Sequence, residues 1–223
     1  MQHSFWHNKW EINQVGFHLE YVHPLLERNL KLFNVNSVLK NPKCTSAKIF
    51  IPLCGKTLDI GFLLAQGYDV VGIELSDIAV KSVFEQLNLT PDISPWAGGE
   101  KYQSDCLTIY VGDYFKLSQQ DLGAIAWVYD RAALIALPDT MRLEYAQHMA
   151  KITQFAPQLL ITLDYDQQIA AGPPFAVSNQ EVEALYGGSY PIQLIEEADI
   201  IAQEPRFQAK GLSSLYQRLY KLK

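Results

Sequence analysis

The sequence predicts one α/β domain over residues 1–223, with a mostly parallel seven-stranded sheet, helices on both faces and an antiparallel terminal strand. Three observations predict this fold. Short apolar runs alternate with helical patterns, as they do in repeated strand–helix–strand units. Several of these runs end on an acidic residue, where the carboxyl end of a strand would lie. The last stretch, residues 212–222, alternates apolar and polar side chains, which is typical of a strand near a sheet edge.

Residues 47–77 carry the clearest pattern. An apolar run at 49–53 leads into a turn with Gly55 and then a helical pattern, and a second apolar run at 70–73 stops at Glu74. This order places a backbone-lined crevice beside a carboxylate. Because a carboxylate at that place accepts hydrogen bonds from ribose hydroxyls, the pattern indicates a nucleoside site.

The N-terminal segment, residues 4–33, is expected to be helical and rich in aromatic side chains. Trp6 and Trp10 share one face of a helix, and Phe17 and Tyr21 repeat that spacing further along. These rings either anchor the helix to the core or cover a ligand. A cationic ligand favours the second reading, since a tryptophan ring attracts positive charge. In that reading the segment up to about residue 33 is a lid that orders on binding.

The remaining chain continues the alternation of strands and helices. Prolines 91 and 95 break the helical pattern that follows residue 76, and the Gly98-Gly99 pair predicts a loop. Ser76 is expected to cap a helix, and Ser178 with Glu181 to form a capping box. Further elements are expected as a hairpin at 102–111, strands at 124–129, 159–163, 192–201 and 212–222, and a helix at 140–155. The expected strand tips carry Glu74, Asp113, Asp130-Arg131 and Asp164.

Composition excludes several classes of partner. Eighteen basic and twenty-four acidic residues give a net charge of −6, which argues against a nucleic-acid surface. No apolar stretch is long enough to cross a bilayer, and the N-terminus does not resemble a secretion signal. Cys44, Cys54 and Cys106 have no zinc spacing and suggest no disulfide scaffold, so a reduced cytoplasmic setting is expected. We expect no metal, because Asp164 and Asp166 without further ligands are weak evidence for one. We expect a monomer, because no heptad pattern or large apolar repeat calls for a partner.

Three ligand classes fit the nucleoside site unequally. A triphosphate-binding loop needs a glycine where this chain has Phe50, so that class is excluded. A dinucleotide oxidoreductase normally has three spaced glycines, and here only Gly55 and the later Gly61 are present. S-adenosylmethionine has no phosphate. It requires close backbone approach, an acid for the ribose and an adenine slot, which Gly55, Glu74 and Asp113-Tyr114 could provide.

The sequence also resembles a known family over nearly its whole length, the bacterial thiopurine S-methyltransferases. The resemblance lies in these motifs: Phe5-Trp6-His7-Asn8-Lys9-Trp10, Gly16-Phe17-His18, Pro52-Leu53-Cys54-Gly55-Lys56-Thr57-Leu58-Asp59, Val71-Gly72-Ile73-Glu74-Leu75-Ser76, Gly112-Asp113-Tyr114-Phe115, Tyr129-Asp130-Arg131-Ala132-Ala133-Leu134, Thr162-Leu163-Asp164-Tyr165-Asp166 and Ala171-Gly172-Pro173-Pro174-Phe175. Thr57 stands where the family commonly has serine.

The resemblance implies a Rossmann-like class I methyltransferase fold and transfer of a methyl group from S-adenosylmethionine to the sulfur of thiopurines or related heterocyclic thiols, with selenium or tellurium species as further acceptors. It implies no general base. By the same resemblance, the cofactor-binding residues are Trp10, Phe17, Leu53, Gly55, Glu74, Asp113, Tyr114 and Arg131, and the substrate-binding residues are Arg131 and Arg206. The alternatives are an NAD(P)-dependent oxidoreductase and a cofactor-binding regulator without turnover.

Overall fold

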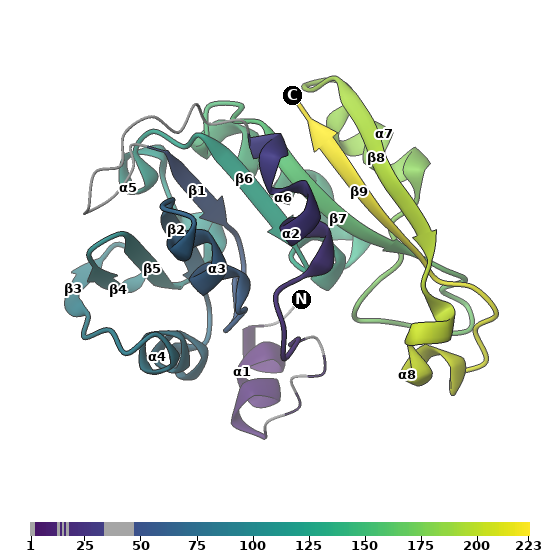
Figure 1. Cartoon of the computed structure of the whole chain (residues 1–223), viewed down its shortest axis with the longest axis horizontal. Coiled ribbons are helices and arrows are strands. Elements are labelled where there is room, and N and C mark those ends of the chain that lie inside the picture. The colour runs from purple at the N-terminus through teal and green to yellow at the C-terminus, as the bar shows by residue number, and fades with distance from the viewer. Residues whose placement is uncertain (1–2, 13, 15, 17, 34–46) are drawn as a thin grey trace. The chain divides into compact units, whose positions relative to one another are not determined.

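A computed structural model describes residues 3–12, 14, 16, 18–33 and 47–223 (Figure 1). The chain divides into two compact units, residues 2–128 and 129–223. Within the described residues, the sheet has nine strands in the order β3-β4-β5-β2-β1-β6-β7-β9-β8. The predicted number of seven is therefore wrong, and β3 at the edge of the sheet is a strand that the sequence analysis did not predict.

The unit of residues 2–128 contains the pattern that was clearest in the sequence. Its strands are β1 (Lys48–Ile51), β2 (Asp69–Glu74), β3 (Asp92–Trp96), β4 (Gly99–Ser104) and β5 (Leu107–Gly112). Its helices are α1 (His3–Glu11), α2 (Pro24–Asn29), α3 (Asp59–Ala65), α4 (Asp77–Gln86) and α5 (Gln119–Leu122), with the 3₁₀ helices η1 (Leu30–Phe33) and η2 (Tyr114–Lys116). Strand β2 pairs in parallel with β1 on one side and β5 on the other. This places the end of β2 between the ends of its two neighbours.

The loop predicted at Gly98-Gly99 is the turn that leads into β4. The stretch before it, which the sequence analysis left unassigned, is strand β3. It pairs antiparallel with β4, and Pro95 lies opposite Glu100. Strand β3 is the outermost strand of the sheet, so the missing N–H of a proline can be tolerated on its open side. The hairpin predicted at 102–111 is confirmed as β4 and β5, which pair antiparallel from Gly99 to Gly112.

Cysteine chemistry differs from the expectation. Cys106, in the turn between β4 and β5, is disulfide-bonded. Cys54 is a free and buried thiol. The expectation that the cysteines form no disulfide is therefore wrong at Cys106, while Cys54 is the small buried residue that its apolar surroundings favour.

The unit of residues 129–223 contains most of β6 (Trp127–Arg131), together with β7 (Gln158–Asp164), β8 (Ile192–Asp199) and β9 (Tyr216–Leu222). Its helices are α6 (Asp139–Ile152), α7 (Asn179–Tyr186) and α8 (Pro205–Gln208), with the 3₁₀ helices η3 (Leu134–Ala136) and η4 (Ile201–Gln203). Strand β9 runs antiparallel to both β7 and β8, which confirms the predicted antiparallel end of the chain.

Helix starts follow the sequence signals only in part. The side chain of Ser76 accepts a hydrogen bond from the Ala79 N–H, as expected for the cap of α4. Ser178 caps α7 in the same way by accepting from the Glu181 N–H. The carboxylate of Glu181 instead pairs with Arg142, so the predicted capping box forms only in its serine half.

Candidate active site

The predicted cofactor residues of the first unit follow the carboxyl ends of three neighbouring parallel strands. Leu53 and Gly55 follow β1, Glu74 ends β2, and Asp113 and Tyr114 follow β5. Since β2 is paired with both other strands, Glu74 lies between the two loops. In open α/β sheets this edge is where ligands bind.

Glu74 is the buried polar centre of this edge, with 6% of its surface exposed. Its Oε2 accepts a hydrogen bond from the Gly55 N–H at 2.8 Å, and its Oε1 accepts one from the Ser76 N–H at 2.9 Å. Burial raises the pKa of this carboxyl, and the backbone donors of Ser76, Gly55 and Leu75 oppose the rise. A carboxylate has about four acceptor sites, so Glu74 can still accept from a hydroxyl group beside these backbone donors.

The turn after β1 has an unusual backbone. Leu53 has φ +44 and Gly55 has φ +54, both in the left-handed region. Gly55 adopts this conformation without a steric cost because glycine has no Cβ, whereas Leu53 adopts it at a steric cost. The Cys54 N–H donates to the Ile73 carbonyl at 3.0 Å, which ties the turn to β2. Strained backbone held by its surroundings is frequent at ligand sites.

Cys54 has a packing role in this turn. A Cβ at Gly72 would lie 2.8 Å from the Cys54 sulfur, so only glycine fits beside it. Burial, followed by the charge of Glu74, raises the pKa of the Cys54 thiol well above its usual value. A thiol held in this neutral state is a poor nucleophile. Cys54 is therefore not a candidate nucleophile of this site.

Trp10 covers the turn from α1. A Cβ at Gly55 would lie 3.3 Å from the Trp10 ring atom Cζ2. The indole is buried, with 7% of its surface exposed, whereas Tyr21 is 57% exposed. The aromatic face predicted for the N-terminal segment therefore includes a ring in contact with the candidate site. Phe17, also predicted for the cofactor slot, lies outside the described residues.

Asp113 and Tyr114 shape the loop after β5. The Asp113 side chain accepts from the Phe115 N–H at 3.0 Å and caps η2. Tyr114 is buried and its ring meets the Phe115 ring edge-on. The alternative reading of Asp113 as a turn residue is thus correct for this hydrogen bond, and its second carboxylate oxygen has further acceptor capacity.

In the second unit, Arg131 is the last residue of β6 and is half-buried. Ala132 follows with φ +65, an uncommon backbone for alanine. Arg206 lies in α8 and is exposed. Both arginines thus belong to the unit of residues 129–223, and nothing in the internal geometry of that unit assigns a ligand to them.

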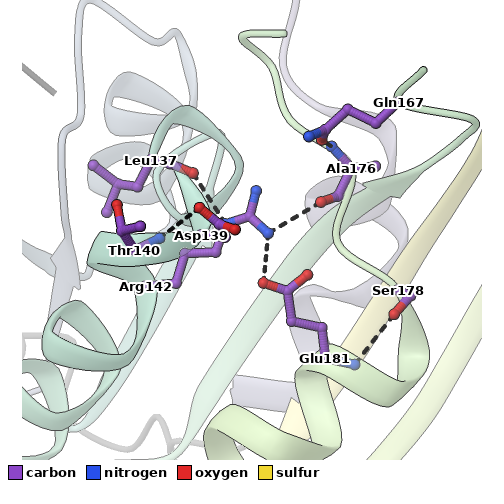
Figure 2. Close-up of polar contacts among 8 residues, drawn as sticks. All are labelled: Leu137, Asp139, Thr140, Arg142, Gln167, Ala176, Ser178 and Glu181. Atoms are coloured by element: carbon purple, nitrogen blue, oxygen red, sulfur yellow. Dashed lines mark hydrogen bonds and ion pairs between the residues drawn. The ribbon is translucent and has the colours of Figure 1, made fainter. Parts of the chain in front are cut away.

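A buried arginine that the sequence analysis did not single out organises the loops after β6 and β7 (Figure 2). Arg142 on α6 is 2% exposed. Its Nε donates to the Leu137 carbonyl at 3.0 Å, and its Nη1 donates to the Ala176 carbonyl at 3.1 Å and pairs with Glu181 at 2.5 Å. Its position in the sequence signals this role, because Arg142 precedes the buried Tyr145 and Ala146 by three and four residues.

The same network fixes the loop that contains two consecutive prolines. The Phe175 N–H donates to the Ile135 carbonyl at 2.7 Å. The Ala176 N–H donates to the Gln167 side-chain oxygen at 2.8 Å (Figure 2). The Tyr165 hydroxyl donates to the Pro174 carbonyl. The loop predicted from its prolines is confirmed. Although it is neither helix nor strand, the backbone groups of Pro174, Phe175 and Ala176 are hydrogen-bonded.

Asp164, which raised the question of a metal, is instead part of an ion-paired group. Its Oδ2 lies 2.6 Å from Nη1 of Arg218 on β9, and the Arg218 Nε pairs with Glu197 on β8. Arg218 is itself mostly buried, with 7% of its surface exposed. These charges link the three antiparallel strands at the end of the chain.

Comparison with known proteins identifies the family. The family model described as thiopurine S-methyltransferase matches residues 1–223. A thiopurine S-methyltransferase of Pseudomonas fluorescens (strain SBW25) is 41% identical over 223 residues, which cover 100% of this chain and 99% of the relative. One from Shewanella piezotolerans is 42% identical over 226 residues, covering 100% and 98%. The chain belongs to the thiopurine S-methyltransferase family.

A solved structure supports the same fold. The 1,6-didemethyltoxoflavin-N1-methyltransferase of Burkholderia thailandensis, solved with S-adenosylhomocysteine, matches with a TM-score of 0.63 at 11% identity, covering 99% of this chain and 86% of the other. The predicted class I methyltransferase fold is confirmed, apart from the number of strands. Membership of the family makes the protein an enzyme, a methyltransferase whose methyl donor is S-adenosylmethionine. None of these findings favours the oxidoreductase alternative or a regulator without turnover.

Proposed function

We propose that the protein transfers the methyl group of S-adenosylmethionine to the sulfur of a thiopurine or a related heterocyclic thiol. Membership of the thiopurine S-methyltransferase family supports the substrate class. The observation that carries the cofactor site is the buried Glu74, whose two oxygens accept the N–H groups of Gly55 and Ser76 and whose carboxylate has remaining acceptor capacity for a ribose hydroxyl.

The residues around Glu74 fit this cofactor. We assign Glu74 to the ribose, the turn of Leu53 and Gly55 to the amino-acid end, and Asp113 with Tyr114 to the adenine side. Trp10 packs over Gly55, where an aromatic face attracts the positive charge of a sulfonium. When bound, the cofactor supplies the reactive methyl carbon. The protein contributes orientation and the exclusion of water.

The acceptor is prepared by charge rather than by a base. A heteroaromatic thiol is more acidic than an alkyl thiol, so much of it is already thiolate near neutral pH. A guanidinium stabilises such an anion and cannot itself accept a proton. We assign this role to Arg131 and Arg206, and we assign no residue as a general base.

A direct assay tests the proposed function. Purified protein, radiolabelled S-adenosylmethionine and 6-mercaptopurine are expected to yield a labelled S-methyl product, and selenite and tellurite can be compared as acceptors. Thermal-shift titration with S-adenosylhomocysteine and with NAD serves as the binding control, because only a true ligand stabilises the fold. No labelled product with any acceptor, despite stabilisation by S-adenosylhomocysteine, would contradict the proposal.

Replacing Arg131 or Arg206 with alanine is expected to raise the KM for the thiopurine or to lower kcat by about tenfold, the loss of one charge-assisted contact of about 1.5 kcal/mol or more. The reason is the lost stabilisation of the thiolate. Steady-state kinetics measure the effect, and circular dichroism checks that each variant folds. Wild-type kinetics in both variants would remove these residues from the acceptor site.

We further propose that the enzyme works as a cytoplasmic monomer, whose N-terminal segment up to about residue 33 closes over the cofactor within a single domain. Among the described residues, no helix is long and apolar enough to span a bilayer. Light scattering measures the mass in solution, and limited proteolysis with and without S-adenosylhomocysteine measures closure. The redox state of Cys106 in the cell tests the proposed cytoplasmic location, because a disulfide is rare in a reducing compartment. Thiol labelling in cell extracts reports its state.

A further inference from the structure

Asp130 is a completely buried carboxylate beside the proposed acceptor residue Arg131, with 0% of its surface exposed. Its Oδ2 accepts a hydrogen bond from the Tyr145 hydroxyl at 2.7 Å, and its Oδ1 accepts one from the Leu134 N–H at 3.1 Å. The Ala133 N–H also donates to this carboxylate. A single side chain thus joins the end of β6, the start of η3 and the middle of α6.

These hydrogen bonds close a short ring of backbone around Arg131 and Ala132. The ring begins at the Asp130 side chain, returns through the N–H groups of Ala133 and Leu134, and contains Ala132 in its left-handed conformation, φ +65. Such a conformation persists in a non-glycine residue only where neighbouring groups impose it. Asp130 supplies these neighbouring groups, and Tyr145 fixes the carboxylate in turn.

The charge on Asp130 is costly to the folded state. Burial raises its pKa to about 6, although the Tyr145 hydroxyl and the N–H groups of Leu134 and Ala133 lower it. The other group that faces it is Tyr186 on α7, whose pKa is raised by burial and by the charge of Asp130. Since the folded pKa lies above the unfolded one, stability falls as pH rises from about 4 to about 6. At neutral pH a neutral side chain would therefore be more favourable for folding.

We propose that Asp130 is a positioning residue for Arg131, and that its buried carboxylate, held by Tyr145, sets the backbone from which the guanidinium reaches the acceptor. The inference rests on the proposed role of Arg131. It explains why an ionised group is retained at a place where it weakens the fold. The ionised carboxylate serves the binding of the methyl acceptor and does not stabilise the fold.

The test uses the full-length enzyme and four variants: Asp130→Asn, Asp130→Ala, Tyr145→Phe and Arg131→Ala. Asp130→Ala and Tyr145→Phe are expected to raise the KM for 6-mercaptopurine or lower kcat by about 10- to 100-fold, as for a misplaced binding group. In the Arg131→Ala background the same changes are expected to have less than about a twofold effect, because both act through one group. Asp121→Asn is the control, since Asp121 also accepts a backbone N–H, from Ser118, but lies at the start of α5 and outside the unit that contains Arg131.

A pH profile separates positioning from a structural role. In the wild type, kcat/KM is expected to fall as pH drops through about 6, beyond the fall caused by protonation of the thiol itself. Asp130→Asn carries a permanently neutral side chain, so it is expected to lack this inflection and to meet the wild-type value near pH 5. Asp121→Asn should keep the wild-type profile. Because Asn preserves the shape, this variant remains informative even if Asp130→Ala fails to fold.

The outcomes distinguish a failure of the proposed role of Arg131 from a failure of the positioning inference. If Arg131→Ala leaves the acceptor kinetics unchanged, the proposed role of Arg131 is wrong, and Asp130 then has no substrate-binding group to position. If Arg131→Ala impairs the acceptor kinetics but the Asp130 and Tyr145 variants add to it independently, only the positioning inference is overturned. A wild-type profile in Asp130→Asn overturns it as well. Non-additive effects together with a lost inflection support it.

Discussion

Replacing Glu74 with alanine is expected to weaken the binding of S-adenosylhomocysteine by roughly 5- to 150-fold, or about 1–3 kcal/mol. The variant removes the acceptor of the proposed ribose hydroxyls. It also leaves the buried N–H groups of Gly55 and Ser76 without their partner, so the turn after β1 loses its tie to the end of β2. Isothermal titration calorimetry measures the affinity directly.

Two further variants make this result specific. Asp77→Ala, three residues along, removes an exposed carboxylate that pairs with Lys81 at 2.7 Å, and it is expected to leave the affinity within about twofold, because such surface pairs contribute little. Glu74→Gln keeps one carbonyl oxygen and should lie between alanine and the wild type. An Asp77→Ala variant as weak as Glu74→Ala, or a Glu74→Ala variant with wild-type affinity, would refute the ribose assignment.

The parts of the fold that the sequence predicts well are those set by local signals. The strand, turn, helix and strand of residues 47–77 depend on neighbouring apolar runs and on the turn at Gly55, and the Ser76 cap reaches only three residues along the chain. Strand β3 was missed because its signal is non-local. Pro95 normally ends a strand, and only the position of β3 at the sheet edge makes it acceptable there.

The candidate site divides in the same way. Strand-tip reasoning finds Glu74, because an acid at the end of the second strand has a local pattern. The spacing of Trp6 and Trp10 indicates an aromatic face but leaves its role open between packing and ligand contact, and Arg206 came only from the family resemblance. The roles of Asp130 and Arg142 depend on partners 15 and 39 residues away, Tyr145 and Glu181. Such pairs follow from packing, so the sequence supplies only the hint of a charge on an apolar helix face.

The side chain of Arg142 is 3% exposed and that of its partner Glu181 is 29% exposed, so we expect their replacement to have unequal effects on stability. Replacing Arg142 with alanine is expected to lower the free energy of unfolding by about 3–5 kcal/mol, the cost of breaking a buried ion pair. The loss leaves the carbonyls of Leu137 and Ala176 without their donor in a buried place. Replacing Glu181 should cost less, because its side chain is 29% exposed and water can replace part of what it loses. Urea unfolding at pH 7.5 measures both values.

A third variant distinguishes the packing of Arg142 from its polar contacts. Arg142→Met fills much of the volume but has no charge and donates to neither carbonyl, so a loss close to that of alanine would assign the stability to the two backbone bonds and the Glu181 ion pair together. A loss confined to alanine would assign it to packing against Phe175, whose ring centre lies 5.9 Å from the guanidinium. Lys81→Ala, which breaks an exposed pair, should cost under about 0.5 kcal/mol. If Arg142→Ala costs no more than that, the loop after β7 is held by the Ile135, Gln167 and Tyr165 contacts instead.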